Sequence, residues 1–214
     1  MIVSAPAKGV KTYVLGVNAQ DYRGEAIISN ASCTTNCIAP ITKIMADSLG
    51  IQKAMMTTVH AYTADQELVD GSHQDLRRGR AAAANIVPTS TGAALSVTEV
   101  LPNLKGLFDG LALRVQTLCG SLADLTFVTT KRTTKDDINQ ILTRAAADAY
   151  KGLVEVTQEP LVSRDILGNP ASAIIDLNLT QVIDGDLVKI IAWYDNEYGY
   201  SCRLIEEAIL AGRS

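Results

Sequence analysis

The stretch Ser29-Asn30-Ala31-Ser32-Cys33-Thr34-Thr35-Asn36-Cys37 marks the point where the sequence changes from short apolar runs to a helical pattern. Ser32 is a favourable N-cap residue, because its hydroxyl can accept a hydrogen bond from an amide of the first helical turn. Apolar residues then recur at helical spacing up to a closing Gly50; they are Ile38, Ile41, Ile44, Met45 and Leu49. The stretch therefore predicts a helix that begins at Cys33.

Cys33 occupies a special position at the start of this predicted helix. The positive end of a helix favours thiolate over thiol, and its free amides can bind a developing oxyanion. The position therefore favours a cysteine nucleophile with a depressed pKa. Spacing alone leaves open a second interpretation, in which Cys33 is one more small buried residue, as Cys37 one turn later is expected to be.

The chain has two histidines, and they differ in their surroundings. His60 lies at the end of an apolar stretch that predicts a strand over 53–62, from which it can project into a cleft. His73 lies in a polar loop, where a solvated side chain is the simpler interpretation. A strand-end histidine is often structural, but a helix-start cysteine with one well-placed histidine favours a Cys33–His60 pair with His60 as the base.

The remaining pattern predicts an α+β fold rather than a repeated βαβ series. Further strands are predicted over 13–17, 26–29, 111–115 and 122–130, and residues 171–182 and 187–194 are β-rich. Helices are predicted over 91–101, from a Thr134–Asp137 capping box to Gly152, and over 199–210. Residues 63–88 show little periodicity and predict a long loop, which in a compact domain is usually functional.

Composition excludes several classes of protein. Apolar residues make up 47% of the 214-residue chain, charged residues make up 20%, and the formal net charge is -4. An acidic chain lacks the positive field that gathers nucleic acid, and no apolar run is long enough to cross a membrane. The four cysteines have neither the density of a secreted disulfide scaffold nor the spacing of a metal site. We therefore expect no metal and a reducing, cytoplasmic location.

A family resemblance rests on several stretches taken together. They are Ser29–Cys37, His60–Gln66, Asp75–Arg80, Asn85–Ala94, Leu101–Gly106 and Trp193–Ser201. In order and spacing they resemble segments of the phosphorylating glyceraldehyde-3-phosphate dehydrogenase family, and the resemblance covers essentially the whole chain. It implies oxidation of glyceraldehyde 3-phosphate to an acyl phosphate through a thioester on Cys33, with hydride transfer to NAD or NADP, in glycolysis or gluconeogenesis.

The resemblance also implies a division of the chain. Residues 33–195 would form a catalytic domain built on a mostly antiparallel mixed sheet with helices on one face. Residues 1–32 would be the C-terminal remnant of a Rossmann-type NAD-binding domain, and 196–214 a helix that packs on that domain. The sequence has no Gly-x-Gly-x-x-Gly turn to hold a dinucleotide pyrophosphate. We therefore expect a chain that lacks most of the nucleotide-binding half and is inactive alone.

Further site residues are implied by the same resemblance. The site for the substrate's own phosphate would contain Thr63, Asp65 and Arg114. The site for attacking inorganic phosphate would contain Ser32, Thr34, Arg78, Thr91 and Gly92. Asn196 and Ser4 resemble cofactor contacts. The loop from Thr63 to Arg80 resembles one that lies near the cofactor of a neighbouring subunit, which implies a homo-oligomer, a tetramer in the family.

The sequence departs from the family's usual pattern at three places outside the Cys–His pair. Gln116-Thr117-Leu118-Cys119-Gly120-Ser121 replaces the commonest Pro-Thr-Pro-Asn-Val-Ser, Glu67 replaces an arginine of the long loop, and Tyr198 stands where tryptophan is usual.

Three other interpretations remain open at this point. An erythrose-4-phosphate dehydrogenase would share the thiol chemistry and the phosphate-binding design. A catalytically silent domain could persist as an assembly module. A Cys–His hydrolase could use the same thiol on activated esters without a cofactor.

Overall fold

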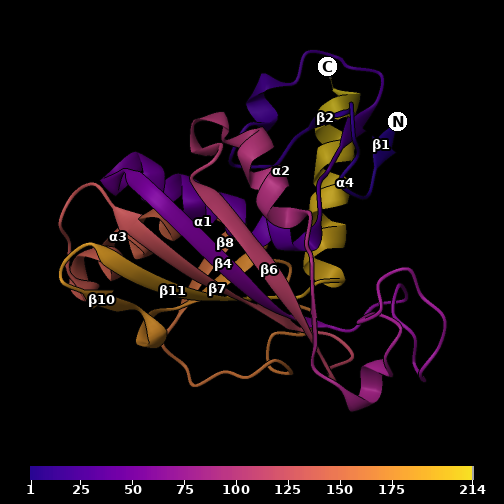
Figure 1. The fold of residues 1–214 in the computed structure, drawn as a ribbon. Coiled ribbons are helices and arrows are strands. Elements are labelled where there is room, and N and C mark those ends of the chain that lie inside the picture. The colour runs from indigo at the N-terminus through magenta and orange to yellow at the C-terminus, as the bar shows by residue number, and fades with distance from the viewer. Residues whose placement is uncertain (214) are drawn as a thin grey trace.

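A computed structural model of the chain describes residues 1–213 and contains an eight-stranded mixed sheet with helices on one face (Figure 1). The strand order is β5-β6-β4-β7-β11-β9-β8, and β10 pairs with β11 outside this path. β4 pairs with β6 and β8 pairs with β9 in parallel, and the remaining pairs of this sheet are antiparallel. The bounds are β4 Ile51–Ala61, β5 Val87–Thr89, β6 Phe108–Val115, β7 Ser121–Thr129, β8 Val154–Thr157, β9 Ala173–Asp176, β10 Gln181–Ile183 and β11 Leu187–Tyr194. The predicted α+β fold with a mostly antiparallel mixed sheet is confirmed.

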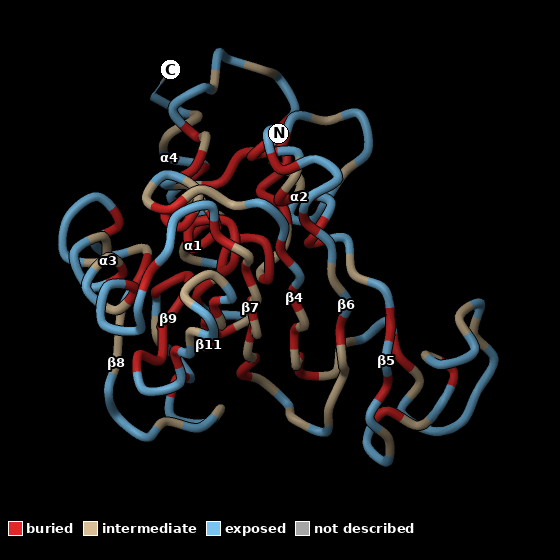
Figure 2. The backbone as a smooth tube through the Cα atoms, turned by 60° about the vertical axis from the view of Figure 1, so that its left-hand side comes forward, coloured by how far each residue is buried: buried red, intermediate tan, exposed pale blue. Residues whose placement is uncertain are grey.

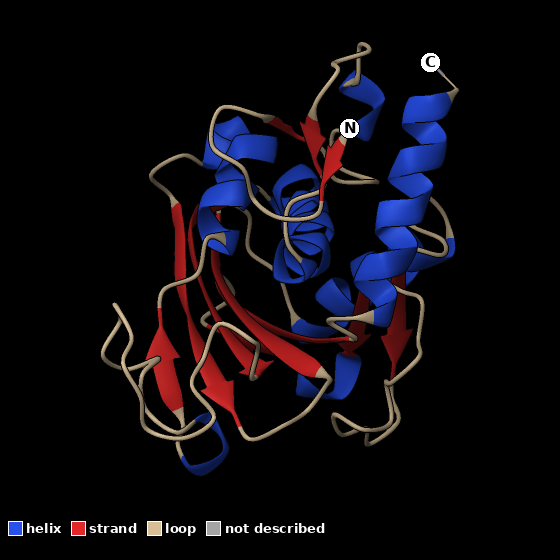
Figure 3. Ribbon diagram, turned by 90° about the vertical axis from the view of Figure 1, so that its right-hand side faces the viewer, coloured by secondary structure: helices blue, strands red, loops and turns tan. Residues whose placement is uncertain are grey.

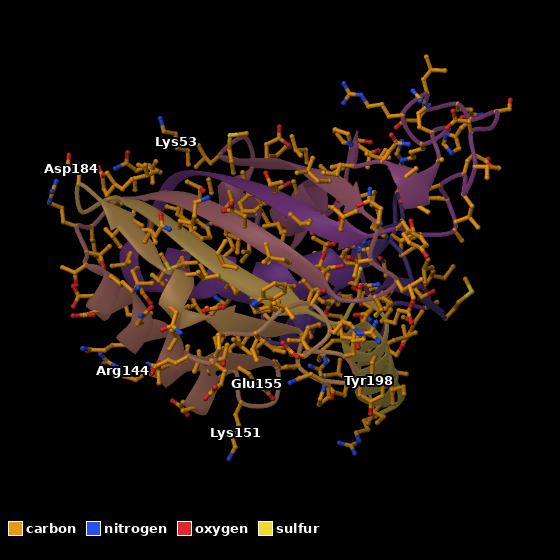
Figure 4. The ribbon with its side chains drawn as sticks, turned by 90° about the horizontal axis from the view of Figure 1, so that it is seen from below. Lys53, Arg144, Lys151, Glu155, Asp184 and Tyr198 are labelled. Carbon is orange, nitrogen blue, oxygen red and sulfur yellow. The ribbon has the colours of Figure 1, made fainter. Side chains whose placement is uncertain are left out.

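Four helices are formed by the described residues, and three of them cover the same face of the sheet (Figure 3). They are α1 Cys33–Leu49, α2 Ala93–Val100, α3 Lys135–Ala147 and, beside the sheet, α4 Tyr198–Gly212. Figure 4 views the sheet from its other face, where the strands lie in front. No helix within residues 1–213 has both the length and the apolar character needed to cross a membrane.

Helix α1 is central to the core. Ile38, Ile41 and Met45 have no exposed surface, and α1 contacts β7, β11 and each of the other three helices (Figure 2). Strand β7 presents every second residue to the helices, because side chains alternate between the faces of a strand. Leu125 and Phe127 are fully buried on that face. This packing fixes the start of α1 against the ends of the central strands.

The predicted capping box of α3 is confirmed. The Thr134 hydroxyl accepts a hydrogen bond from the Asp137 amide, and the Asp137 carboxylate accepts one from the Thr134 amide. The helix ends at Ala147, earlier than the predicted Gly152, and the chain then turns into β8, which the sequence pattern did not predict.

A second, small sheet lies at the N-terminal end of the chain. Its strands are β1 Ile2–Val3, β2 Lys11–Thr12 and β3 Ile28–Ser29, paired in parallel in the order β1-β3-β2. The strand predicted over 13–17 is wrong. That segment is a turn, because the Asn18 side chain bonds the Val14 amide and the Thr12 carbonyl while Gly16 adopts a φ of 76°. β3 leads directly to Ser32 and α1.

Candidate active site

The sulfur of Cys33 faces the imidazole of His60. Cys33 is the first residue of α1, and Ser32 caps this helix by accepting a hydrogen bond from the Thr35 amide at 3.1 Å. His60 lies next to the end of β4 and is 5% exposed. Its Nε2 atom is 3.5 Å from Cys33 Sγ. The two side chains that the sequence analysis paired therefore lie within hydrogen-bonding reach of each other.

Arg114 contacts the other ring nitrogen of His60. The parallel pairing of β4 with β6 sets Arg114 directly beside His60. Its Nη1 atom is 2.8 Å from His60 Nδ1 and donates to the Ala61 carbonyl oxygen at 3.1 Å. The same carbonyl oxygen is 2.6 Å from Nδ1. A guanidinium and a backbone carbonyl therefore converge on one imidazole nitrogen.

Burial dominates the electrostatics of the Cys33–His60 pair. It raises the pKa of the Cys33 thiol, although hydrogen bonds from Thr34 and the charge of Arg114 act in the opposite direction. Burial, followed by the charge of Arg114, lowers the pKa of His60 to about 4. The pKa of Cys33 therefore shifts in the direction opposite to the predicted depression, because desolvation is the largest contribution and exceeds those of Thr34 and Arg114. At neutral pH a thiol faces a neutral imidazole.

Tyr194 is a buried residue of the site that the sequence argument did not single out. Its hydroxyl lies 2.8 Å from the Thr34 hydroxyl and 2.8 Å from the Thr58 hydroxyl. Its ring meets the ring of His60 edge to face, with centroids 6.0 Å apart. The Thr34 hydroxyl points into the core. An anion at the start of α1 would therefore contact the backbone amide of Thr34 and not its hydroxyl. The sequence signals for Tyr194 were its place at the end of a β-rich segment and within the stretch Trp193–Ser201 that resembles the family.

The loop between β4 and β5 gathers charged groups near Ala61. Arg78 Nη1 lies 2.6 Å from Asp65, and Asp65 also accepts a hydrogen bond from the Thr63 hydroxyl. Arg78 further donates to the Thr89 hydroxyl at 2.8 Å and to the Ser90 carbonyl at 3.2 Å. Both predicted phosphate sites are thus linked, with Arg78 already held by a carboxylate.

The start of α2 lies beside Arg78 through Ser90. Thr91 accepts a hydrogen bond from the Ala93 amide at 3.2 Å. A Cβ atom at Gly92 would meet one side chain, that of Pro6, at 4.0 Å. The chain's own packing therefore does not require glycine at this position, and the space is open to a ligand that approaches the backbone.

The two predicted cofactor contacts lie on opposite sides of the Cys33 segment in sequence. Asn196 Oδ1 accepts hydrogen bonds from the Gly120 amide and the Ser121 hydroxyl, each at 3.0 Å. This holds the side chain with its Nδ2 group left to donate, which fits a carboxamide ligand. Ser4 is exposed and follows Val3, whose carbonyl accepts a hydrogen bond from Asn30 at 3.1 Å.

Ser121 was also missed by the sequence argument, although it ends the segment that departs from the family pattern. Its hydroxyl accepts a hydrogen bond from the Ala61 amide at 3.2 Å and donates to Asn196. It therefore connects the end of β4, beside His60, to the predicted nicotinamide contact.

Comparison with known proteins now adds an independent finding. A family model described as glyceraldehyde 3-phosphate dehydrogenase, C-terminal domain, matches residues 32–196. The chain belongs to the glyceraldehyde 3-phosphate dehydrogenase family.

Relatives in this family are similar over nearly the whole chain. Glyceraldehyde-3-phosphate dehydrogenase 1 of Streptomyces avermitilis is 53% identical over 99% of this chain, which covers 64% of that protein. The chloroplastic glyceraldehyde-3-phosphate dehydrogenase A of Zea mays is 53% identical over 97% of this chain, which covers 52% of it. The glyceraldehyde-3-phosphate dehydrogenase of Mycobacterium tuberculosis is 53% identical over the whole chain, which covers 63% of it. The chain thus spans about half to two thirds of the length of these curated relatives.

Proposed function

We propose that this chain supplies the catalytic half of a phosphorylating glyceraldehyde-3-phosphate dehydrogenase that uses NAD or NADP. The observation that carries the proposal is the 3.5 Å approach of Cys33 Sγ to His60 Nε2 at the start of a helix. The names of the similar relatives support the choice of aldehyde.

In the first half of the reaction, Cys33 attacks the aldehyde carbon. The Sγ–H bond breaks, the proton passes to His60 Nε2, and the new C–S bond gives a thiohemiacetal. The first-turn amides of α1 stabilise the oxyanion that forms on the former carbonyl oxygen. Loss of a hydride from the thiohemiacetal carbon would leave a thioester on Cys33, and a nicotinamide held by Asn196 and Ser4 would supply the hydride acceptor.

The second half of the reaction releases the product from Cys33. Inorganic phosphate attacks the thioester carbon, the C–S bond breaks, and an acyl phosphate leaves. We assign the attacking phosphate to Ser32, the Thr34 amide, Arg78, Thr91 and Gly92. The open space at Gly92 and the contact between Arg78 and Ser90 support this assignment. Arg78 must exchange part of its ion pair with Asp65 for the phosphate.

The substrate's own phosphate is assigned to Thr63, Asp65 and Arg114. Arg114 supplies the positive charge and lies beside the catalytic pair, and Thr63 supplies a hydroxyl two residues after Ala61. Asn196, held by Gly120 and Ser121, is assigned to the nicotinamide carboxamide, and Ser4 to a second cofactor contact.

We further propose that the chain works in a homo-oligomer, a tetramer as in the family, in the cytoplasm. The loop between β4 and β5 carries large apolar side chains in exposed positions, which supports association. They are Leu68, Val69, Leu76 and Ile86. The cysteines within the described residues are all free thiols, as expected in a reducing compartment.

Acylation by the product tests the proposal without any cofactor. The purified chain is mixed with 1,3-bisphosphoglycerate, and the adduct is located by peptide mass mapping. We expect one 3-phosphoglyceroyl group per chain, on Cys33. The change His60→Asn should slow acylation by ~10²–10⁴-fold, because a placed base is worth that much. Cys202→Ala is the matched control and should acylate like the wild type.

The assembly module and the hydrolase would each give a different result in the same experiment. A folded chain without an adduct would indicate a silent assembly module. An adduct that water removes as fast as phosphate does would indicate a hydrolase. Acylation at Cys119 or Cys202 in place of Cys33 would overturn the proposed site.

A further inference from the structure

The two neighbours of His60 Nδ1 require different protonation states of that atom. The Ala61 carbonyl oxygen, 2.6 Å away, can only accept and requires a proton on Nδ1. The guanidinium of Arg114, 2.8 Å away, can only donate and requires a bare Nδ1. A neutral imidazole carries one ring proton, so it satisfies one of these neighbours at a time.

The protonation of Nδ1 determines whether Nε2 faces Cys33 with a proton or with a lone pair. When Arg114 holds Nδ1, the proton is on Nε2 and points at the sulfur, so Nε2 cannot take the thiol proton. When Nδ1 donates to Ala61, the lone pair of Nε2 faces the sulfur and His60 is a base.

The contacts of Arg114 favour the first of these tautomers in the free chain, and they act against the 2.6 Å contact of Nδ1 with the Ala61 carbonyl oxygen. One amino group of Arg114 reaches both His60 Nδ1 and the Ala61 carbonyl, so it satisfies the two acceptors together. The pairing of β4 with β6 keeps Arg114 beside His60. The charge of Arg114 also contributes to the lowered pKa of His60. The other groups that face His60 are Cys33 from α1, Tyr194 from β11 and Asp65 from the loop after β4.

A phosphate group offers Arg114 a better acceptor than an imidazole nitrogen. Hydrogen bonds from a guanidinium to an anionic oxygen are roughly twice as strong as neutral ones and are often bidentate. Asp65 is the nearby carboxylate, but it is already paired with Arg78 and bonded by Thr63. A dianion bound next to Thr63 would therefore draw Arg114 away from the ring.

We propose that Arg114 is a positioning residue that sets the tautomer of His60, and that a phosphate dianion bound by Arg114 frees Nε2 to accept the Cys33 proton. The inference rests on the proposed function, because the dianion is taken to be the substrate's own phosphate. In the free chain Nε2–H faces the thiol. In the complex, solvent takes the Nε2 proton and supplies one to Nδ1, which donates to Ala61; the Sγ–H bond then breaks as a new Nε2–H bond forms. A phosphorylated aldehyde thus activates the base that it needs.

Nitrogen NMR of the histidine rings tests this directly. The chain is labelled with ¹⁵N-histidine, and His73→Gln assigns the signals of His60. Long-range ¹H–¹⁵N correlations at neutral pH show which nitrogen carries the proton. In the free chain we expect a bare Nδ1 and a protonated Nε2. Saturating glycerol 3-phosphate, an unreactive dianion, should give the reverse, a protonated Nδ1 and a bare Nε2.

Two variants separate the role of Arg114 from general charge effects. Arg114→Leu should show a protonated Nδ1 with and without the dianion. Arg77→Leu, a change at an exposed arginine of the loop between β4 and β5, should keep the exchange seen in the wild type. The comparison of free and bound wild-type chain stands even if Arg114→Leu does not fold.

The outcomes distinguish this inference from the proposed function. A protonated Nδ1 in the free wild-type chain would overturn the tautomer inference, while acylation of Cys33 by 1,3-bisphosphoglycerate would still support the enzyme. Binding of glycerol 3-phosphate without a change of the protonated ring nitrogen would also overturn the tautomer inference and leave the proposed function supported. Failure of the dianion to bind would overturn both the phosphate site and the inference.

Discussion

At the scale of single residues, the site depends on a hydroxyl group that lies behind the catalytic pair. Tyr194 joins Thr34, next to the nucleophile, to Thr58, two residues before the base. The hydroxyl is fully buried, and its pKa is raised well above the ordinary value by desolvation, so it stays neutral and can donate one bond and accept another. It thereby links the start of α1 to β4.

Removing this hydroxyl should weaken both the fold and the site. In Tyr194→Phe, the buried Thr34 hydroxyl loses its 2.8 Å hydrogen bond, and we expect a loss of ~1–3 kcal/mol in the free energy of unfolding. Urea unfolding measures this loss. The rate of acylation of Cys33 should also fall, because Thr34 orients the first turn of α1. Tyr62→Phe, at a half-buried tyrosine just beyond β4, is the control. Equal stability of Tyr194→Phe and the wild type would contradict this account.

At the scale of elements, α4 is attached to the small N-terminal sheet by a buried carboxylate. Glu207 on α4 is 1% exposed. The side-chain nitrogen of Asn30 donates to Glu207 Oε2 at 2.6 Å, in the side-chain orientation in which the Asn30 oxygen also accepts from the Leu204 amide. Glu207 Oε1 has no hydrogen-bond partner among the described residues. Burial raises the pKa of Glu207 from 4.5 to about 7. The folded state therefore holds a proton here that the unfolded state releases.

The raised pKa predicts a stability that decreases as pH rises. The contribution of Glu207 is complete below a pH of 4.5 and is lost as pH rises through about 7. Relative to Glu207→Gln, the wild type should lose about 2 kcal/mol of unfolding free energy between about pH 5 and about pH 8. Denaturant unfolding across this range measures it. Glu197→Gln, at the exposed N-cap of α4, is the control. Parallel pH curves for the wild type and Glu207→Gln would refute the prediction.

At the scale of the whole molecule, the sequence predicted local features better than pairings. Cys33 and His60 could be found because the residues around them indicate a helix start and a strand end. Arg114 could not be placed beside His60, because that contact depends on a parallel pairing between strands whose residues are 54 positions apart. Tyr194 and Thr34, 160 positions apart, meet because α1 packs against β11, a contact that no short sequence pattern shows. Residues 13–17 were misjudged because the Asn18 side chain competes with strand pairing.

A further whole-molecule feature is the apolar stripe on the outer side of α4. Tyr198, labelled in Figure 4, is 52% exposed, and Ile205 and Ile209, on the same side of the helix, are 62% and 47% exposed. The spacing of seven and then four residues places the three side chains in one row. The opposite side of α4 is buried through Arg203 and Glu207. We infer that this stripe is where a nucleotide-binding half would dock on the chain.

The 214-residue chain alone should therefore not reduce NAD at a useful rate, whereas a separately supplied nucleotide-binding half should restore turnover. Asn196 and Ser4 can orient a nicotinamide, but the sequence has no Gly-rich turn to bind the pyrophosphate. Holding the reacting carbons together is worth about 7–11 kcal/mol, most of which a loosely held cofactor loses.

The assay supplies glyceraldehyde 3-phosphate, phosphate and NAD and follows NADH with and without the second half. Ile205→Glu should abolish complementation while Cys33 still acylates, and Ile183→Glu, at an exposed position of β10, should leave both complementation and acylation intact. Full turnover by the chain alone would refute the prediction.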